Sequence, residues 1–294
     1  MLERFQRRPT DRARADAAGE RLIPAEMFRN TSTLYVVLDS HFASIPVTAL
    51  RSGGRPLIAV RPVLRLPRLP TRSDIACASP GAPGAATVLA DADGDLPGSR
   101  MEAMVIAQLL KSTPHVGKAA TSVALFAARS DAVLHVSVHF GFCAGGGSIR
   151  LYDRPVSALE ISVKRLAPSL VTLSGCSTSG SNDPELAGAL STAFLASGSS
   201  QVIATLRSVS DSGAFEVMSR FYKAGGAVDP VRTLAAIQAE LASTDNIDWP
   251  AFTVFGKEVC TSQPGERWVS RASSSVQRWT APHESRGADL KSSD

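Results

Sequence analysis

Two side chains with reactive chemistry follow two successive apolar runs of the sequence. His139 ends the run DAVLHVSVH, and Cys176 comes just after the run SLVTLS. Apolar, β-branched runs of this length predict strands, and in an open parallel sheet ligands bind beyond the carboxyl ends of the strands. If the two strands are neighbours, an imidazole and a thiol meet at one edge of the sheet. This pair suits nucleophilic acyl transfer, in which the thiolate attacks a carbonyl carbon and the imidazole moves the proton.

The segment around Cys176 also permits other interpretations. The stretch GCSTSGS at 175–181 resembles a phosphate-binding loop, but Ser181 occupies the position of the lysine that this loop requires. A tyrosine-phosphatase loop needs an arginine where the chain has Asn182, and the glycine spacing of a nucleophile elbow is missing. From the residues alone, Cys176 is either a nucleophile or a small side chain packed under a turn, and both interpretations stay open.

The other histidines and cysteines form no pattern typical of a metal site. His135 lies four residues before His139 and inside the predicted strand, which indicates a buried, hydrogen-bonded histidine. The four cysteines include no CxxC pair, so we expect no metal and no other cofactor. The amino terminus lacks the apolar segment of a secretory signal, and no apolar run reaches membrane-spanning length. We therefore expect a cytoplasmic protein with reduced thiols and no membrane partner.

Positive charge is concentrated near the amino terminus. Residues 1–72 hold 13 arginines and 6 acidic residues, a net charge of +7, so the rest of the chain carries −3 of the total of +4. A basic arm could touch nucleic acid, but base-stacking aromatic residues are not interleaved with these arginines. The composition favours a solvated basic surface, with at most an indirect relation to nucleic acid.

The positions of His139 and Cys176 are set by the strands and helices that the rest of the sequence predicts. From residue 131 onward, strand-length apolar runs alternate with amphipathic helical segments, which favours a mainly parallel α/β sheet covered by helices. Strands are predicted at 33–39, at the start of 86–100, and at 131–140, 169–175, 201–207 and 251–256. Helices are predicted at 101–110, 184–197, 211–224 and 230–241, and a capping box of Ser99 and Glu102 opens the first.

Composition also divides the chain into three segments. Residues 1–30 are polar and charged and are predicted to be a leader. Residues 31–257 carry the alternating strands and helices of the main domain. The whole chain of 294 residues is 44% hydrophobic, which is enough to form a sizeable core. Residues 258–294 are polar and rich in serine, which is typical of a flexible tail.

Several motifs, in order and in spacing, resemble one known family. The run VLHVSVHFGF resembles the "lHxxxHG" strand of the CHAT peptidases, a bacterial branch of the caspase-like and separase-like cysteine peptidases. The run TLSGCST resembles their strand-to-loop motif around the catalytic cysteine. Similar agreement is seen in LDSHFASIPVTAL, GDLPGSRMEAMVIAQLL, LAGALSTAFLASGSSQVIATLRSVSD and the closing segments FEVMSRFYKAGG, DPVRTLAAIQAEL and WPAFTVFG. The resemblance covers about residues 30–257.

The resemblance implies a fold, an activity and roles for particular residues. It implies a caspase-like three-layer sandwich with a degenerate half at 31–130 and a catalytic half at 131–257. It implies a cysteine endopeptidase that cleaves a protein substrate without metal, with Cys176 as nucleophile and His139 as general base. It also implies activation by a partner or signal, and because no sensor is recognisable in the sequence we expect the sensor on a separate chain.

The chain departs from the family pattern beside the reactive residues. The glycine expected after the catalytic histidine is Phe140, with Gly141 one position later. We expect the backbone N–H groups of Phe140, Gly141 and Gly175 to form the oxyanion site, although Phe140 lacks the backbone freedom of glycine. A catalytically weak or inactive interaction module with the same fold is therefore the alternative hypothesis.

Charged residues near the expected cleft could set the cleavage specificity. In caspase-like enzymes the segment after the strand that follows the cysteine lines the first specificity pocket, which here contains Arg207, Ser208 and Asp211. Arg207 would favour an acidic substrate residue, whereas Asp211 or Asp153 would favour a basic one. The sequence leaves open which of these side chains faces the substrate.

Overall fold

The structure is a computed structural model in which most of the chain is described. It describes residues 2–24, 32–39, 42–68, 84–175 and 184–256. All of these residues belong to one compact unit, Met1–Cys260. The predicted tail at 258–294 and the nucleophile candidate Cys176 lie outside the described residues.

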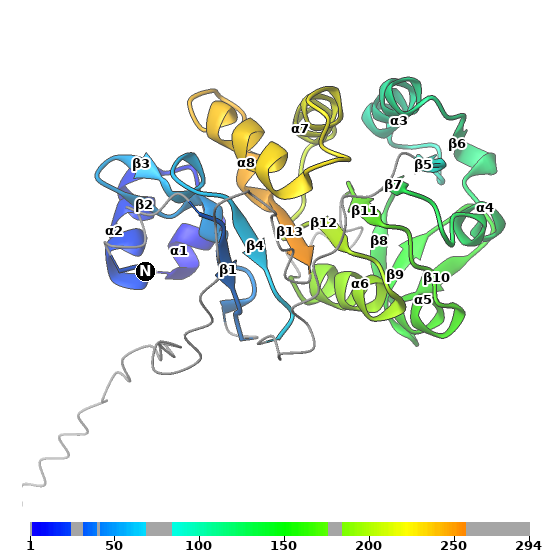
Figure 1. Ribbon diagram of the computed structural model, residues 1–294, viewed down its shortest axis with the longest axis horizontal. Helices are drawn as coiled ribbons and strands as arrows, with labels where there is room; N and C mark the ends of the chain where they lie inside the picture. The colour runs from blue at the N-terminus through cyan, green and yellow to red at the C-terminus, as the bar shows by residue number, and fades with distance from the viewer. Residues whose placement is uncertain (1, 25–31, 40–41, 69–83, 176–183, 257–294) are drawn as a thin grey trace, which may run out of the picture. The chain divides into compact units, whose positions relative to one another are not determined.

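A mixed, mostly parallel sheet forms the centre of this unit (Figure 1). Its eight strands, in spatial order, are β1 (Leu34–Val36), β4 (Val63–Arg65), β13 (Phe252–Gly256), β12 (Gln201–Thr205), β11 (Leu170–Leu173), β7 (Val133–Ser137), β5 (Ala86–Ala90) and β6 (Pro114–Val116). Strand β13 is antiparallel to β12, and the other described neighbours in the sheet are parallel. The side chains of β7 and β11 are buried on both faces of the sheet, as expected of central parallel strands.

Helices cover both faces of the sheet and complete the three-layer α/β sandwich that the sequence predicts (Figure 1). One layer contains α3 (Pro97–Leu110), α7 (Asp211–Lys223) and α8 (Pro230–Leu241), and the other contains α4 (Ser122–Ala127), α5 (Ala158–Lys164) and α6 (Pro184–Ser197). Each layer packs an apolar face against the sheet, so the core is divided into two clusters of buried side chains, one on each side. Among the described residues, no helix is long and apolar enough to cross a bilayer.

Smaller elements are added at the two ends of this sandwich. A three-stranded antiparallel sheet lies beside α5 and α6, and its strands in order are β10 (Pro155–Ser157), β9 (Gly146–Arg150) and β8 (Phe140–Cys143). A short hairpin joins β2 (Arg51–Ser52) to β3 (Arg55–Pro56), and single turns of 3₁₀-helix occur at Val47–Ala49, Leu57–Ala59, Gly117–Ala119 and Trp249–Ala251. Because β8 begins at the residue after His139, the small sheet starts next to the expected site in the chain.

The segment predicted as a polar leader contains two helices, α1 (Leu2–Arg7) and α2 (Arg12–Leu22). Phe5 and Ala18 are fully buried in the same core cluster as α7 and α8. Gly19 packs so closely against the backbone of Arg51 that an added Cβ would lie 1.9 Å from its carbonyl oxygen. A few small and apolar residues are therefore enough to bury one face of these charged helices.

Most predicted helix ends agree with the structure, but the capping box does not. Helix α3 begins at Pro97, and both Ser99 and Glu102 are buried within it. The carboxylate of Glu102 bonds to His135 in the core, so it cannot fold back to cap the helix. The amino end of α3 is capped instead from α7, since the N–H of Gly98 donates to Asp211 Oδ2 over 3.0 Å. The prediction of a capping box is therefore wrong.

Candidate active site

The carboxyl ends of β7 and β11 lie side by side, as the position of the two reactive residues requires. Leu173 pairs with Val136 across the two strands, and the N–H of the next residue, Ser174, donates to the carbonyl of Val136 over 2.8 Å. In the sequence, His139 comes three residues after Val136, and Cys176 comes three residues after Leu173. The two residues thus follow matched positions of neighbouring strands. The thiol of Cys176 itself lies outside the described residues.

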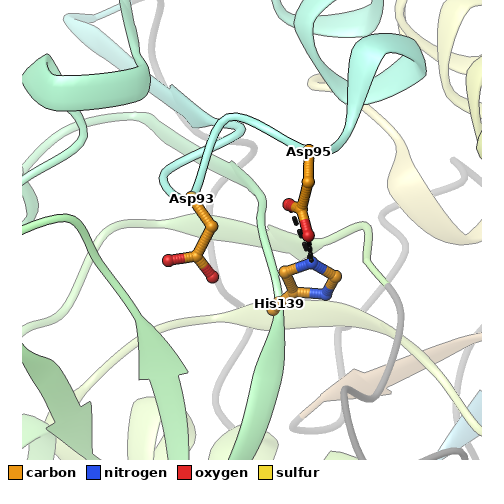
Figure 2. A group of neighbouring side chains, drawn as sticks. All are labelled: Asp93, Asp95 and His139. Carbon is orange, nitrogen blue, oxygen red and sulfur yellow. Dashed lines mark hydrogen bonds and ion pairs between the residues drawn. The ribbon is translucent and has the colours of Figure 1, made fainter.

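The imidazole of His139 is held by a carboxylate from the neighbouring loop (Figure 2). Its Nε2 atom lies 3.0 Å and 3.2 Å from the two carboxylate oxygens of Asp95. Because a carboxylate only accepts, Nε2 carries the proton and the neutral ring keeps its lone pair on Nδ1. That Nδ1 atom is buried and has no hydrogen-bond partner among the described residues. The ring is therefore oriented with its basic nitrogen free to take a proton.

The loop that carries Asp95 connects β5 to α3 and is fixed by a second aspartate. Asp91 is buried in a left-handed backbone conformation, and its carboxylate accepts from the N–H of Leu96 over 2.8 Å. The same carboxylate binds Arg100, with 2.8 Å between Nε and Oδ2. Gly94 has a φ of 83°, which a residue without a side chain adopts readily. Together these contacts hold the turn that presents Asp95 to His139.

The same turn brings a second carboxylate near the imidazole (Figure 2). One ligand atom from each of Asp93, Asp95 and His139 lies within 4.8 Å of the others, a spacing that a divalent cation could bridge. In this structure, however, Asp95 is hydrogen-bonded to His139 and Asp93 lies 3.3 Å from a guanidinium nitrogen of Arg150. Both acids are thus already paired with protein groups, and we assign Asp95 to the orientation of His139.

Two of the residues predicted to form the oxyanion site, Phe140 and Gly175, lie together where β8 begins. An added Cβ on Gly175 would lie 2.1 Å from the carbonyl oxygen of Val138 and 2.7 Å from the ring of Phe140. Only glycine fits in this contact. Gly141 pairs with Ser148 in the small sheet, and its carbonyl accepts a bond from that hydroxyl. The structure thus brings Phe140 and Gly175 into contact and places Gly141 within the β8–β9 ladder.

A small pocket borders Gly175, which precedes Cys176 in the chain. Arg207 and Ser208, two of the predicted specificity residues, contribute to its wall. The charge of Arg207 is paired, because its guanidinium lies 3.0 Å from Asp248 Oδ1 and also bonds to the carbonyl of Ile247. Arg207 therefore contributes to the wall of this pocket with its charge compensated by Asp248.

The other two predicted specificity residues make contacts elsewhere. Asp211 accepts the N–H of Gly98 at the start of α3. Asp153 accepts from the backbone N–H of Ser122 over 2.7 Å and from its hydroxyl, at the start of α4. Desolvation acts to raise the pKa of Asp153, but the bonds from Ser122 outweigh it and hold the pKa below its ordinary value. The structure does not bring either carboxylate to the pocket beside Gly175.

The sequence matches a known protein family over most of its length. The model of the CHAT domain family matches residues 12–283. The chain belongs to the CHAT domain family. The match begins at Arg12, the first residue of α2, so the CHAT domain includes most of the segment that composition predicts to be a leader. The three-layer sandwich expected of a CHAT cysteine peptidase fold is present.

Two of the solved structures that match this chain are of one cysteine proteinase. The Arg-specific cysteine proteinase gingipain R (RgpB) is 11% identical, with 87% of this chain and 75% of that chain covered and a TM-score of 0.46. The complex of the Porphyromonas gingivalis RgpB pro- and mature domains is also 11% identical, with 87% and 69% covered and a TM-score of 0.49. No curated protein matches the sequence.

A second histidine of the CHAT motif, His135, lies in the core rather than at the site. Its Nε2 lies 2.8 Å from Oε1 of Glu102, and its Nδ1 lies 3.4 Å from the hydroxyl of Tyr222. That hydroxyl also bonds to Thr172 on β11 over 2.9 Å. All four side chains are buried, so β7, β11, α3 and α7 are joined by one polar network. The prediction of a buried, hydrogen-bonded His135 is confirmed.

Asp95 is the site residue of this CHAT domain that the sequence analysis misses. It belongs to the turn DADGD after the predicted strand that begins at Ala86. Since β5 pairs with β7 in parallel, this turn and His139 follow adjacent strand ends. An acidic turn after a strand is a recognisable signal, but its relevance depends on the strand order, which the sequence pattern does not specify.

Proposed function

We propose that this CHAT domain is a cysteine endopeptidase that hydrolyses a peptide bond of a protein substrate with Cys176 and His139. The observation that carries the proposal is the orientation of His139, whose Nε2 is held by Asp95 while its buried Nδ1 has no partner among the described residues. The adjacency of β7 and β11 supports it, because the chain reaches both residues from matched strand ends. CHAT membership supports the same reaction class.

The proposed reaction proceeds in two stages that share one base. Nδ1 of His139 takes the thiol proton of Cys176, and the sulfur attacks the substrate carbonyl carbon. Backbone N–H groups near Phe140, Gly141 and Gly175 stabilise the resulting oxyanion. The intermediate expels the amine product, which receives the proton from His139, and leaves an acyl-enzyme. Water then attacks the acyl carbon as His139 takes one of its protons. The carbon–sulfur bond breaks, the sulfur of Cys176 recovers that proton from His139, and the acid product leaves.

In this proposal Asp95 is a positioning residue and no metal or organic cofactor takes part. Its carboxylate keeps the proton on Nε2 and stabilises the imidazolium that forms on proton transfer. The activating partner, if it follows the family pattern, is a sensor on a separate chain. The chain's own contribution is the oriented base, the nucleophile and the neighbouring pocket.

The test compares two cysteines of the same chain. Cys143 is exposed on β8 and serves as the matched control for Cys176. With fluorescently labelled denatured casein and a mixed peptide library as substrates, we expect Cys176→Ala and His139→Ala to abolish cleavage. We expect Cys143→Ala to retain it. Equal cleavage by wild type and Cys176→Ala would overturn the assignment.

Alkylation tests the nucleophile without relying on turnover. Iodoacetamide at neutral pH should modify Cys176 at least tenfold faster than Cys143, because a neighbouring base increases the thiolate fraction. His139→Ala should remove this difference. If both thiols react at the same slow rate and no substrate is cut, the chain is an interaction module that retains the fold without the activity.

A further inference from the structure

We propose that Asp211, the first residue of α7, is a positioning residue for His139 and acts through the turn that carries Asp95. The inference rests on the proposed function and adds to it a residue from a different helix. The sequence suggests Asp211 as a specificity residue, but the structure directs its carboxylate to the backbone of Gly98, three residues after Asp95.

The orientation of His139 depends on a side chain that packing does not hold. The carboxylate of Asp95 is 63% exposed and bonds to the imidazole of His139. A short exposed side chain lies where its backbone places it, so the turn between β5 and α3 decides whether Asp95 reaches the ring. A misplacement of about 1 Å can lower an enzymatic rate by about 100-fold. Groups that fix this turn therefore matter to the site.

Two aspartates hold the backbone that follows Asp95. Asp91 accepts from the N–H of Leu96 over 2.8 Å, and Asp211 accepts from the N–H of Gly98 over 3.0 Å. The first N–H groups of a helix have no acceptor within the helix. Leu96, which precedes α3, has an aliphatic side chain and cannot accept a bond, so α3 needs an acceptor from elsewhere. Asp211 supplies it from α7.

The contact between the two helix ends is close. An added Cβ on Gly98 would lie 2.4 Å from Cβ of Asp211 and 2.9 Å from its Oδ2, so only glycine allows this approach. Because Asp211 begins α7 and also caps α3, its carboxylate lies at the amino ends of both helices. The N–H groups at a helix amino end favour a negative charge. One carboxylate thus joins the two helix ends.

The start of α7 is itself anchored to a buried group. Asp248 is 3% exposed and accepts from the N–H and the hydroxyl of Ser210 over 3.0 Å and 2.7 Å. The hydroxyl of Ser210 in turn accepts from the N–H of Gly213 over 3.1 Å. These bonds fix the residues on either side of Asp211, so its carboxylate provides a fixed reference for Gly98.

Two substitutions in the full chain break the contact from its two sides. Asp211→Ala removes the acceptor, and Gly98→Ala pushes the carboxylate away. Asp211→Asn keeps an oxygen that accepts the bond and serves as the conservative variant. Asp229→Ala is the matched control, because Asp229 accepts from the N–H of Arg232 at the start of a different helix, α8, over 3.2 Å. Each variant is first checked by thermal melting.

The tautomer of His139 is measured by ¹⁵N NMR of histidine-labelled protein, which needs no turnover. The ring signals are assigned by their loss in His139→Gln and are recorded above the pH of their last change. In wild type the proton should lie on Nε2. Asp211→Ala and Gly98→Ala should at least double the fraction protonated on Nδ1, and Asp211→Asn and Asp229→Ala should not. A lower melting temperature with an unchanged tautomer would show that Asp211 is merely structural and would overturn the inference.

Kinetics test whether Asp211 acts through Asp95. For Cys176-dependent peptide hydrolysis, Asp211→Ala should lower kcat/KM by about 5- to 20-fold, with KM within about twofold of wild type. In an Asp95→Ala background the same substitution should change kcat/KM by less than about twofold, because the group that it positions is already absent. Multiplicative losses in the double variant would contradict the inference.

The outcome is separable from that of the proposed function. If iodoacetamide modifies Cys176 no faster than Cys143, the nucleophile assignment fails, and the tautomer measurement still decides the role of Asp211. If Cys176 is selectively reactive but Asp211→Ala leaves the tautomer of His139 unchanged, the proposed function stands and this inference fails.

Discussion

Nε2 of His139 lies 3.0 Å from Oδ1 of Asp95, although the two residues are 44 positions apart in the sequence. The imidazole is only 15% exposed, whereas the carboxylate is 63% exposed. A mostly buried ring is thus held by an acid at the rim of the site. Solvent weakens the electrostatic part of this interaction but does not remove its directional effect on the ring.

Asp95→Asn is expected to lower kcat/KM by about 10- to 100-fold, less than the loss of roughly 10⁴-fold known for a buried triad aspartate, because Asp95 is exposed. The amide can donate to Nε2 and favour the wrong tautomer of His139. The measurement is Cys176-dependent peptide hydrolysis.

Asp93→Asn is the matched control for this prediction. Asp93 lies on the same turn but pairs with Arg150, so its variant should keep kcat/KM within about twofold of wild type. A similar loss in both variants would mean that the turn, and not the bond from Asp95 to His139, is responsible.

Gly175→Ala is expected to reduce both stability and activity. The added Cβ would lie 2.1 Å from the carbonyl oxygen of Val138, so β7 and β11 must separate where they support the site. The expected loss in the free energy of unfolding is about 1–3 kcal/mol, measured by urea denaturation.

Gly188→Ala provides the contrast. Gly188 lies inside α6, and an added Cβ meets no atom within 4 Å. This variant should gain about 0.5–1 kcal/mol, because alanine favours a helix over glycine. A loss of stability in the Gly188 variant equal to that at Gly175 would contradict the steric explanation.

The buried pair of Glu102 and His135 should show strong coupling. Both side chains are at most 1% exposed, and they lie 2.8 Å apart. Glu102→Leu leaves the imidazole without its partner and should cost about 3–5 kcal/mol. The double variant Glu102→Leu/His135→Leu should recover at least half of this loss, because neither polar group then remains buried alone. Additive losses in a double-mutant cycle would contradict the interpretation.

Tyr222 is predicted to make the protein sensitive to alkaline pH. Burial raises the pKa of Tyr222 above its ordinary value of 10.0, and the nearby Glu102 adds to this effect while the bond from Thr172 opposes it. The raised pKa contributes stability that is fully present below pH 10 and is lost as the pH rises towards the folded-state pKa, because the unfolded tyrosine ionises first.

Tyr222→Phe isolates this contribution. At pH 7 the variant should lose about 1–2 kcal/mol, because Thr172 and His135 each lose a hydrogen-bond partner. Above pH 10 the difference from wild type should shrink by up to about 1.4 kcal/mol per pH unit. Urea denaturation at pH 7 and at pH 10–11 measures both quantities, and a constant difference across this range would refute the prediction.

Local signals account for much of the fold. The predicted helix at 230–241 agrees with α8, because Asp229 caps the helix and Pro230 begins it. The predicted strands at 131–140 and 169–175 contain β7 and β11, since their β-branched and apolar side chains suit a strand buried on both faces. The capping box failed because a local pattern of Ser99 and Glu102 competes with burial, and the buried bond to His135 prevails.

The sequence by itself determined which reactive residues follow which strands, and its ordered motifs indicated the CHAT family. The tertiary structure decided that Asp95 orients His139 and that Asp248 neutralises Arg207, through contacts that span 44 and 41 positions. Hydrophobic periodicity reports which face of an element is buried, so it predicts elements and their ends. It carries no information on strand order, and the partners of a charged side chain depend on that order.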